Sequence, residues 1–305
     1  MSESIKHLPV MVDEVISFLE PQNEKIYLDG TFGQGGHTKK ILSKANCNVF
    51  AIDRDYESFF FAKKLEDEFP DNFSFKHEKL SNVEKILKKH SLEKFDGLVL
   101  DLGVSNTQLN NSERGFSFAS NGPLDMRMDR KNSLLTAEKI INEFSEKQLS
   151  DIFFYYGEER NSRKIASSIV KYRQKRMIKT TFALSDIIKK INSYDKKHPA
   201  TRVFQSLRIF INDELRELDF FLNHLRNILK RKSRIVILSF HSLEDRIVKN
   251  FFKKNSQIKK EFIGKSELYE HHLKIITKKP IVASKNEIRI NNRARSAKMR
   301  VAEVS

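Results

Sequence analysis

The sequence has little cysteine and no long apolar run. Its one cysteine, Cys47, excludes an intramolecular disulfide and a cysteine-based zinc site, and fits a reducing compartment. No stretch approaches the roughly 20 apolar residues that a membrane-spanning helix needs. The N-terminal residues lack the basic and apolar regions of a secretory signal. We therefore expect a cytoplasmic protein with no membrane partner, and no metal ligands are predicted.

Acidic residues are outnumbered by basic ones. The 305 residues include 56 Lys+Arg and 40 Asp+Glu, which gives a formal charge of +16. A polyanionic partner explains such an excess, because basic side chains bind phosphates and release counterions. A genome that drifts toward A and T also enriches lysine, together with asparagine, isoleucine and phenylalanine. Composition alone leaves both explanations open.

Short apolar segments alternate with helical ones over the first hundred residues. The predicted strands are 25–28, 48–52, 73–77 and 95–100, and the predicted helices are about 38–44, 56–68 and 83–90. The second half of 95–100 is uniformly apolar, which is typical of a strand buried on both faces. This alternation predicts a parallel α/β sheet with right-handed crossovers.

The pattern changes after Asp101. Residues from about 108 to 195 are expected to be helical, and Pro199 is expected to open a long helix whose buried side reaches Leu218. The α/β pattern returns with predicted strands at 234–240, 273–277 and 298–304 and a helix at 243–252. We predict a Rossmann-like doubly wound sheet with an inserted helical domain. Residues 1–108 and 213–305 form the sheet domain, and residues 109–212 form the insertion, which we expect to recognise the substrate.

Four of the ten glycines lie in D-G-T-F-G-Q-G-G-H, residues 29–37, between a predicted strand and a predicted helix. Glycines there permit positive φ and let a ligand touch the backbone; an ordinary tight turn is the alternative. The spacing differs from the G-x-G-x-x-G of dinucleotide folds. The acid Asp29 suits a cationic sulfonium and amino group better than a pyrophosphate.

Asp53 ends the second predicted strand, where a carboxylate can accept hydrogen bonds from both ribose hydroxyls. A plain loop acid is the alternative explanation of this residue. Together with the glycine spacing, its position favours S-adenosylmethionine over NAD as the cofactor.

Two polar residues follow strands at the same predicted edge, where ligands of doubly wound sheets bind. Asp101 ends the fourth strand, and His241 follows the fifth. Asp101 is a candidate to accept a proton from an exocyclic cytosine amine, whose lone pair is delocalised into the ring, or to bind the cofactor. His241 is a candidate to contact the base or the RNA backbone, with a buried structural histidine as the alternative. The D/N/S-P-P-Y/F signature of amino-methyltransferases is absent.

Eight motifs occur in an order that resembles the bacterial 16S rRNA cytosine-N4 methyltransferase family, RsmH (MraW), from about residue 7 to 300. They are D-G-T-F-G-Q-G-G-H, A-I-D-R-D, D-L-G-V-S, R-G-F-S-F, G-P-L-D-M-R-M, Y-G-E-E-R, H-P-A-T-R-V-F-Q-S-L-R-I and S-F-H-S-L-E-D-R-I-V-K. The resemblance implies a class I S-adenosylmethionine-dependent methyltransferase, with the sheet domain as its methyltransferase domain. It also implies that the enzyme methylates the N4 amine of a cytosine at the P site, in the decoding centre of 16S rRNA within the small ribosomal subunit.

The resemblance also implies a set of cofactor contacts. Carried over position by position, these contacts fall on Gly35, Gly36, His37, Asp53, Leu80, Asp101 and Gln108. The family usually has phenylalanine at the position of Leu80, so the packing against adenine becomes aliphatic. The family's N-P-R-A-R-S is N-N-R-A-R-S here, with Asn292 in place of proline.

Arginines supply the candidate RNA contacts, because rRNA phosphates and splayed bases are commonly held by arginine. The candidates are Arg114, Arg127, Arg202, Arg208, Arg293 and Arg295. A solvated helix face with ion pairs inside the insertion is the alternative. Competing functions are a DNA amino-methyltransferase, a non-catalytic ribosome-assembly factor and a nicotinamide dehydrogenase. The oligomeric state stays open.

Overall fold

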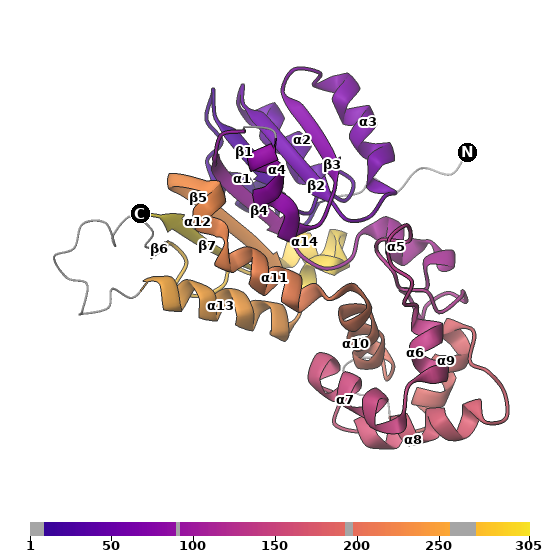
Figure 1. The fold of residues 1–305 in the computed structure, drawn as a ribbon. Coiled ribbons are helices and arrows are strands. Elements are labelled where there is room, and N and C mark those ends of the chain that lie inside the picture. Colours follow the sequence, from indigo (N-terminus) through magenta and orange to yellow (C-terminus); the bar gives the residue numbers. More distant parts are fainter. Residues whose placement is uncertain (1–8, 90–91, 193–197, 257–272) are drawn as a thin grey trace. The chain divides into compact units, whose positions relative to one another are not determined.

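The computed structural model describes residues 9–89, 92–192, 198–256 and 273–305. The chain forms two compact units, one made of residues 1–103 and 215–305 and the other of residues 104–214 (Figure 1). The second unit starts before the predicted limit of 109, since the short helix α5 (Asn106–Asn110) packs against the turn that follows it. The role of the second unit in substrate recognition stays a prediction.

The first unit is built on a seven-stranded sheet with the order β3-β2-β1-β4-β5-β7-β6. Pairing is parallel from β1 to β5 and antiparallel for β7 with β5 and β6. The order reverses between β1 and β4, which confirms the predicted doubly wound sheet. The strands are β1 (Ile26–Asp29), β2 (Asn48–Asp53), β3 (Phe73–His77), β4 (Phe95–Asp101), β5 (Leu229–Ser239), β6 (Leu273–Ile275) and β7 (Lys298–Val304).

Both faces of the sheet are buried under helices. Successive strand residues point to opposite faces, so one strand can contribute to two core clusters. In β2, Val49 and Ala51 join one core cluster, whereas Phe50 and Ile52 join the other. The helices that contribute to the first cluster are α1 (Val12–Leu19), α2 (Gly36–Lys44), α3 (Ser58–Glu68) and α14 (Lys285–Ile290). Those that contribute to the second are α4 (Val83–Lys89), α11 (Glu214–Asn223), α12 (Leu225–Ile228) and α13 (Ser242–Ser256).

The second unit is helical and has its own apolar core, centred on residues such as Phe153, Ile165 and Leu207. Besides α5 it contains α6 (Ala137–Glu143), α7 (Glu146–Gly157), α8 (Ser162–Arg173), α9 (Thr181–Lys189) and α10 (Thr201–Asn212). Ser145 and Gln148 form a capping box at the start of α7, in agreement with the sequence pattern.

Two sequence-based expectations about this unit are wrong. Residues 115–136 form no helix, because the chain there takes left-handed backbone conformations at Gly115 and Met126. The long helix expected from Pro199 to Leu218 is broken at Asp213, whose φ of 50° ends α10 before α11 begins. The predicted helix end at His90 and residues 193–195 lie outside the described residues. Helices α1 and α14 were not predicted.

Among the described residues, no helix is both long enough and apolar enough to cross a membrane.

Asn212 provides a test of the insertion's packing. It is 1% exposed, accepts a hydrogen bond from the Met128 amide (2.7 Å) and donates one to the Met126 carbonyl (2.8 Å). Met126 is held in the left-handed region, at φ 62°. We expect Asn212→Ala to lower the free energy of unfolding by about 2–4 kcal/mol, because it leaves buried backbone groups unsatisfied. Thermal denaturation measures the loss of stability, and Asn223→Ala, at an exposed site, is the control variant. Equal losses in the two variants would contradict this role.

Candidate active site

Three aspartates end three neighbouring parallel strands of the first unit. Asp53 ends β2, Asp29 ends β1 and Asp101 ends β4, and these strands are adjacent in the order β2-β1-β4. The carboxyl ends of parallel strands share one edge of the sheet, which is where doubly wound folds bind ligands. This edge is the candidate active site.

Asp29 holds the glycine-rich loop in shape. It is 2% exposed, and its two oxygens accept hydrogen bonds from the Thr31 amide (3.1 Å) and the Thr38 hydroxyl (2.6 Å). Burial raises the pKa of the Asp29 carboxyl, and the hydrogen bond from Thr38 opposes that rise. Both oxygens therefore serve the loop itself, and these contacts do not support the expectation that Asp29 faces a cationic ligand.

Gly35 and Gly36 are required where the loop enters α2, because neighbouring side chains fill the space that a Cβ atom would occupy. Gly35 has φ 78°, and a Cβ atom there would lie 2.6 Å from the Phe32 ring. A Cβ atom on Gly36 would lie 2.9 Å from Pro9. The first amides of α2 have no partner within the helix, so a ligand can approach the backbone at this point.

Asp53 has oxygens with remaining acceptor capacity. They accept hydrogen bonds from the Gly33 amide and the Asp55 amide, both at 2.7 Å. A carboxylate offers about four acceptor directions, and Asp53 is half-buried, so its carboxylate can accept a further donor from a ligand. Burial raises the pKa of the Asp53 carboxyl to about 6.

Asp101 carries a buried oxygen, Oδ1, that accepts no hydrogen bond from the described residues. Its Oδ2 lies 3.9 Å from His37 Nδ1. His37 Nε2 is 3.0 Å from the Val10 carbonyl, which can only accept, so Nε2 carries the proton and Nδ1 faces Asp101. Burial raises the pKa of the Asp101 carboxyl, and the positive charge of Arg293 opposes that rise. Buried polar atoms without a partner are rare, so Oδ1 marks a place for a donor from a ligand.

His241 lies in the turn from β5 to α13 and contacts Glu244. Its Nδ1 accepts from the Glu244 amide at 3.4 Å, and its Nε2 lies 3.1 Å from Glu244 Oε1. The other Glu244 oxygen accepts from the amides of Phe240 (2.8 Å) and His241 (3.3 Å). His241 Nε2 is buried and forms no hydrogen bond with the described residues, so the structural alternative stays open and the catalytic role stays a prediction.

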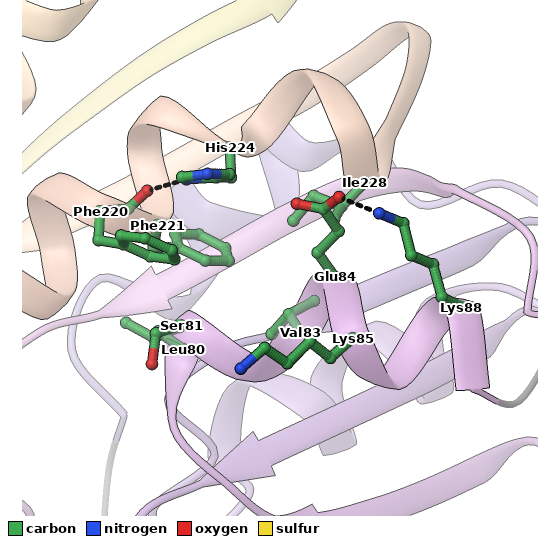
Figure 2. A pocket seen from close by; sticks show the side chains of 10 residues that line it. All are labelled: Leu80, Ser81, Val83, Glu84, Lys85, Lys88, Phe220, Phe221, His224 and Ile228. Carbon is green, nitrogen blue, oxygen red and sulfur yellow. Dashed lines mark hydrogen bonds and ion pairs between the residues drawn. The ribbon is translucent and has the colours of Figure 1, made fainter.

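Leu80 packs over the start of the glycine-rich loop, since a Cβ atom on Gly30 would lie 2.8 Å from its side chain. It also lines a pocket of about 210 Å³ that contains the stacked rings of Phe220 and His224 (Figure 2). None of the three aspartates lines this pocket, and we assign it no cofactor role. Its lining is Leu80, Ser81, Val83, Glu84, Lys85, Lys88, Phe220, Phe221, His224 and Ile228.

Gln108 belongs to the second unit, where it is 4% exposed. Its side chain accepts a hydrogen bond from the Ser105 amide (2.9 Å) and so closes the capping box of α5. Its predicted cofactor contact stays a prediction.

Two of the predicted RNA-binding arginines hold the loop of the second unit instead. Arg114 is 1% exposed and donates to the carbonyls of Arg127 (3.0 Å) and Met128 (3.2 Å). Arg114 therefore has a structural role in this loop, and its assignment to RNA stays a prediction. Arg127 forms a two-pronged ion pair with Asp125, at 2.7 and 3.0 Å.

Two of the other four arginines have charged partners inside the protein, and two are exposed. Arg208 pairs with Glu214 through two hydrogen bonds of 2.9 Å. Arg293 is half-buried, and its charge acts on Asp101. Arg202 and Arg295 are exposed, although Arg202 donates to the Glu158 carbonyl at 3.1 Å. The intradomain alternative therefore describes most of these arginines.

Comparison with protein families matches residues 4–305 to the MraW methylase family. The chain belongs to that family. The ribosomal RNA small subunit methyltransferase H of Rickettsia massiliae (strain Mtu5) is 44% identical over 304 residues, covering 97% of each chain. The enzyme of that name from Rickettsia bellii (strain RML369-C) is 45% identical, covering 97% of this chain and 98% of the relative. The family resemblance seen in the motifs is confirmed.

Among solved structures, a SAM-dependent O-methyltransferase from Thermotoga maritima aligns with a TM-score of 0.41 and 9% identity. The alignment covers 98% of this chain and 67% of that one. A score this low adds nothing to the family assignment.

Sequence analysis missed part of this MraW methylase site. Glu244 was not predicted, although an acid three residues after His241 at a helix start is a capping pattern. Arg293 was assigned to RNA, and only the fold reveals that its charge acts on Asp101. No sequence spacing links residues so far apart in the chain.

The loop anchor at Asp29 is testable through Thr38, which is fully buried. Thr38→Val keeps the shape of the side chain but removes the 2.6 Å hydrogen bond to Asp29. We expect the free energy of unfolding to fall by about 1–3 kcal/mol, since a buried carboxylate loses a donor. Chemical denaturation measures this loss, and Ser43→Ala, on the exposed side of α2, should change it by much less. A Thr38→Val protein as stable as the parent would show that the hydrogen bond does not anchor the loop.

Proposed function

We propose that this protein transfers the methyl group of S-adenosylmethionine to the N4 amine of a cytosine in 16S rRNA. The target lies in the decoding centre of the small ribosomal subunit, at the P site, and the reaction takes place in the cytoplasm. Membership of the MraW methylase family and the names of its Rickettsia relatives support the reaction and the substrate class. The choice of N4 and of the P site follows the family resemblance of the motifs.

The observation that carries the proposal is Asp101 Oδ1, a buried acceptor without a partner among the described residues. Asp101 is the last residue of β4, which pairs with β1, the strand that leads into the glycine-rich loop. An amine donor from a substrate would satisfy it. An NAD-dependent dehydrogenase would instead need a pyrophosphate beside buried carboxylates, where like charges repel.

The residues at the edge fit S-adenosylmethionine. Asp53 can accept hydrogen bonds from both ribose hydroxyls through its remaining acceptor directions. The first amides of α2, next to Gly35 and Gly36, would donate to the amino-acid part of the cofactor, and Leu80 would offer an apolar contact to the adenine. When bound, the cofactor supplies an activated methyl group on a positively charged sulfur.

Asp101 serves the substrate amine. The exocyclic nitrogen of cytosine is a poor nucleophile because its lone pair is delocalised into the ring. An acceptor on one N–H helps to localise the pair and takes up the proton as the nitrogen gains its methyl group. Burial raises the pKa of the Asp101 carboxyl, which makes it a better proton acceptor than an exposed aspartate.

The decisive experiment incubates the protein with isotope-labelled S-adenosylmethionine and small ribosomal subunits that lack the modification. Mass spectrometry of the digested nucleosides then locates the label. Label in N4-methylcytidine supports cofactor, reaction and substrate together. Label in another nucleoside refutes the assignment to N4, and cofactor binding without transfer to rRNA favours an assembly factor.

The role of Asp101 is tested with Asp101→Asn. We expect kcat to fall about 10²–10⁴-fold, because the amide cannot take up the proton. The dissociation constant for S-adenosylmethionine should change far less. Asp67→Asn, at an exposed position on α3, is the control and should keep full activity. If cofactor affinity falls as far as kcat, Asp101 binds the cofactor instead.

Asp53 predicts how cofactor affinity depends on pH. Its carboxyl has a pKa of about 6 and must be ionised to accept from two hydroxyls, so affinity is full above that pKa and falls below it. Between pH 7 and pH 5 the dissociation constant for S-adenosylmethionine should rise about tenfold, as measured by calorimetry. In Asp53→Asn, binding should be weaker and nearly independent of pH in this window. An unchanged pH dependence in the variant would assign the titration to another group.

A further inference from the structure

The second unit contains a basic segment, defined here as residues 160–185, that lacks acidic residues. It carries eight lysines and arginines and no aspartate or glutamate. Seven of the eight are exposed, the exception being Arg173. The segment runs from the start of α8 through the following turn into α9 (Figure 1). Its basic residues are Arg160, Arg163, Lys164, Lys171, Arg173, Lys175, Arg176 and Lys179.

Contacts within the protein do not account for this charge. Arg173 donates to the carbonyls of Ile141 and Phe144, both at 2.6 Å, and so has a structural role. Among the described residues, the other seven form no ion pair. The C-terminus of α8 favours one or two cations in its last turn, but that effect does not extend to Lys179. The segment therefore concentrates unneutralised charge on one part of the unit.

The charges of α8 lie opposite its buried side. Ile165 and Ile169 face the core of the unit, whereas Lys164 and Lys171 are exposed about two turns apart on the other side. Ser167 and Ser168 lie between the two lysines along this face. Small side chains there leave room for a polyanion to approach the helix closely.

Exposed side chains suited to stacking accompany the charges. Tyr172 is 37% exposed, Met177 54% and Phe182 43%. Single-stranded RNA is commonly bound by cations that follow its phosphates and by aromatic rings on which unpaired bases stack. An acidic protein surface or an anionic membrane would use the charges but has no bases for the rings.

We propose that the basic segment is an rRNA-binding surface, on which Lys171, Lys175 and Arg176 contact phosphates and Tyr172 stacks on an unpaired base. This inference rests on the proposed function, since it takes the rRNA substrate as the polyanion. It replaces the arginines of α10 and of the loop after α5 as the main RNA contacts of the second unit.

The test measures binding of a fluorescent single-stranded fragment of 16S rRNA at several salt concentrations. The variant K171Q/K175Q/R176Q removes three charges from the segment. The control K139Q/K147Q/K190Q removes three exposed charges from elsewhere in the same unit, so net charge changes equally. Each phosphate contact contributes about 0.7 to the salt slope. We expect the segment variant to lose about 2 units of slope and roughly 100-fold in affinity at 0.1 M salt.

The control variant should lose much less affinity and slope, and equal losses in the two variants would overturn the proposal. Tyr172→Ala should weaken binding severalfold without changing the slope, because stacking is uncharged. Displacement of the fragment by polyglutamate as readily as by unlabelled RNA would instead indicate a site for acidic protein, and would overturn the assignment.

A separate readout keeps this result distinct from the proposed function. Methyl transfer by the segment variant should show a raised KM for rRNA and an unchanged kcat. If the parent protein is active and the variant has the same KM for rRNA, only the rRNA-binding surface is refuted. A parent that binds the fragment through the segment but transfers no methyl group refutes only the proposed function.

Discussion

The crowding of one buried and two half-buried carboxylates at one edge of the sheet is the constraint on which the rest of this site depends. Asp29, Asp53 and Asp101 end neighbouring strands. Each carboxylate therefore needs hydrogen-bond donors while it lies near the other two. Burial raises the pKa of all three, and a buried carboxylate is costly unless it is hydrogen-bonded. The glycine-rich loop, the start of α2 and the turn after β2 supply the required donors.

The three carboxylates differ in exposure and in their partners, and that difference separates their roles. Asp29 is 2% exposed, and its oxygens accept from Thr31 of the loop and Thr38 of α2, so it shapes the backbone. Asp53 also receives one amide on each oxygen, but it is half-buried. Asp101 is half-buried and has one oxygen with no partner among the described residues. The greater exposure of Asp53 and Asp101 separates a structural acid from two that can meet ligands.

Sequence patterns predicted the features that depend on local chemistry. The period of apolar residues located the strands of the sheet, and glycine clustering located the loop after β1. The break at Asp213 was not predictable, because the apolar spacing from Val203 to Leu218 is equally consistent with one continuous helix. Only packing reveals that Leu207 and Leu218 belong to different cores. The apolar spacing therefore fits either one helix or two, and tertiary contacts determine that there are two.

The same distinction applies to the arginines that were predicted to contact RNA, because the sequence does not reveal their partners inside the protein. A planar guanidinium suits paired carbonyls or a carboxylate, and Arg114 and Arg208 are used in this way inside the second unit. The basic segment differs, since its arginines Arg160, Arg163 and Arg176 are exposed and form no ion pair with the described residues. A run of cations without any acid, as in residues 160–185, leaves no internal partner nearby in sequence. That lack of internal partners is the physical basis of the proposed rRNA-binding surface.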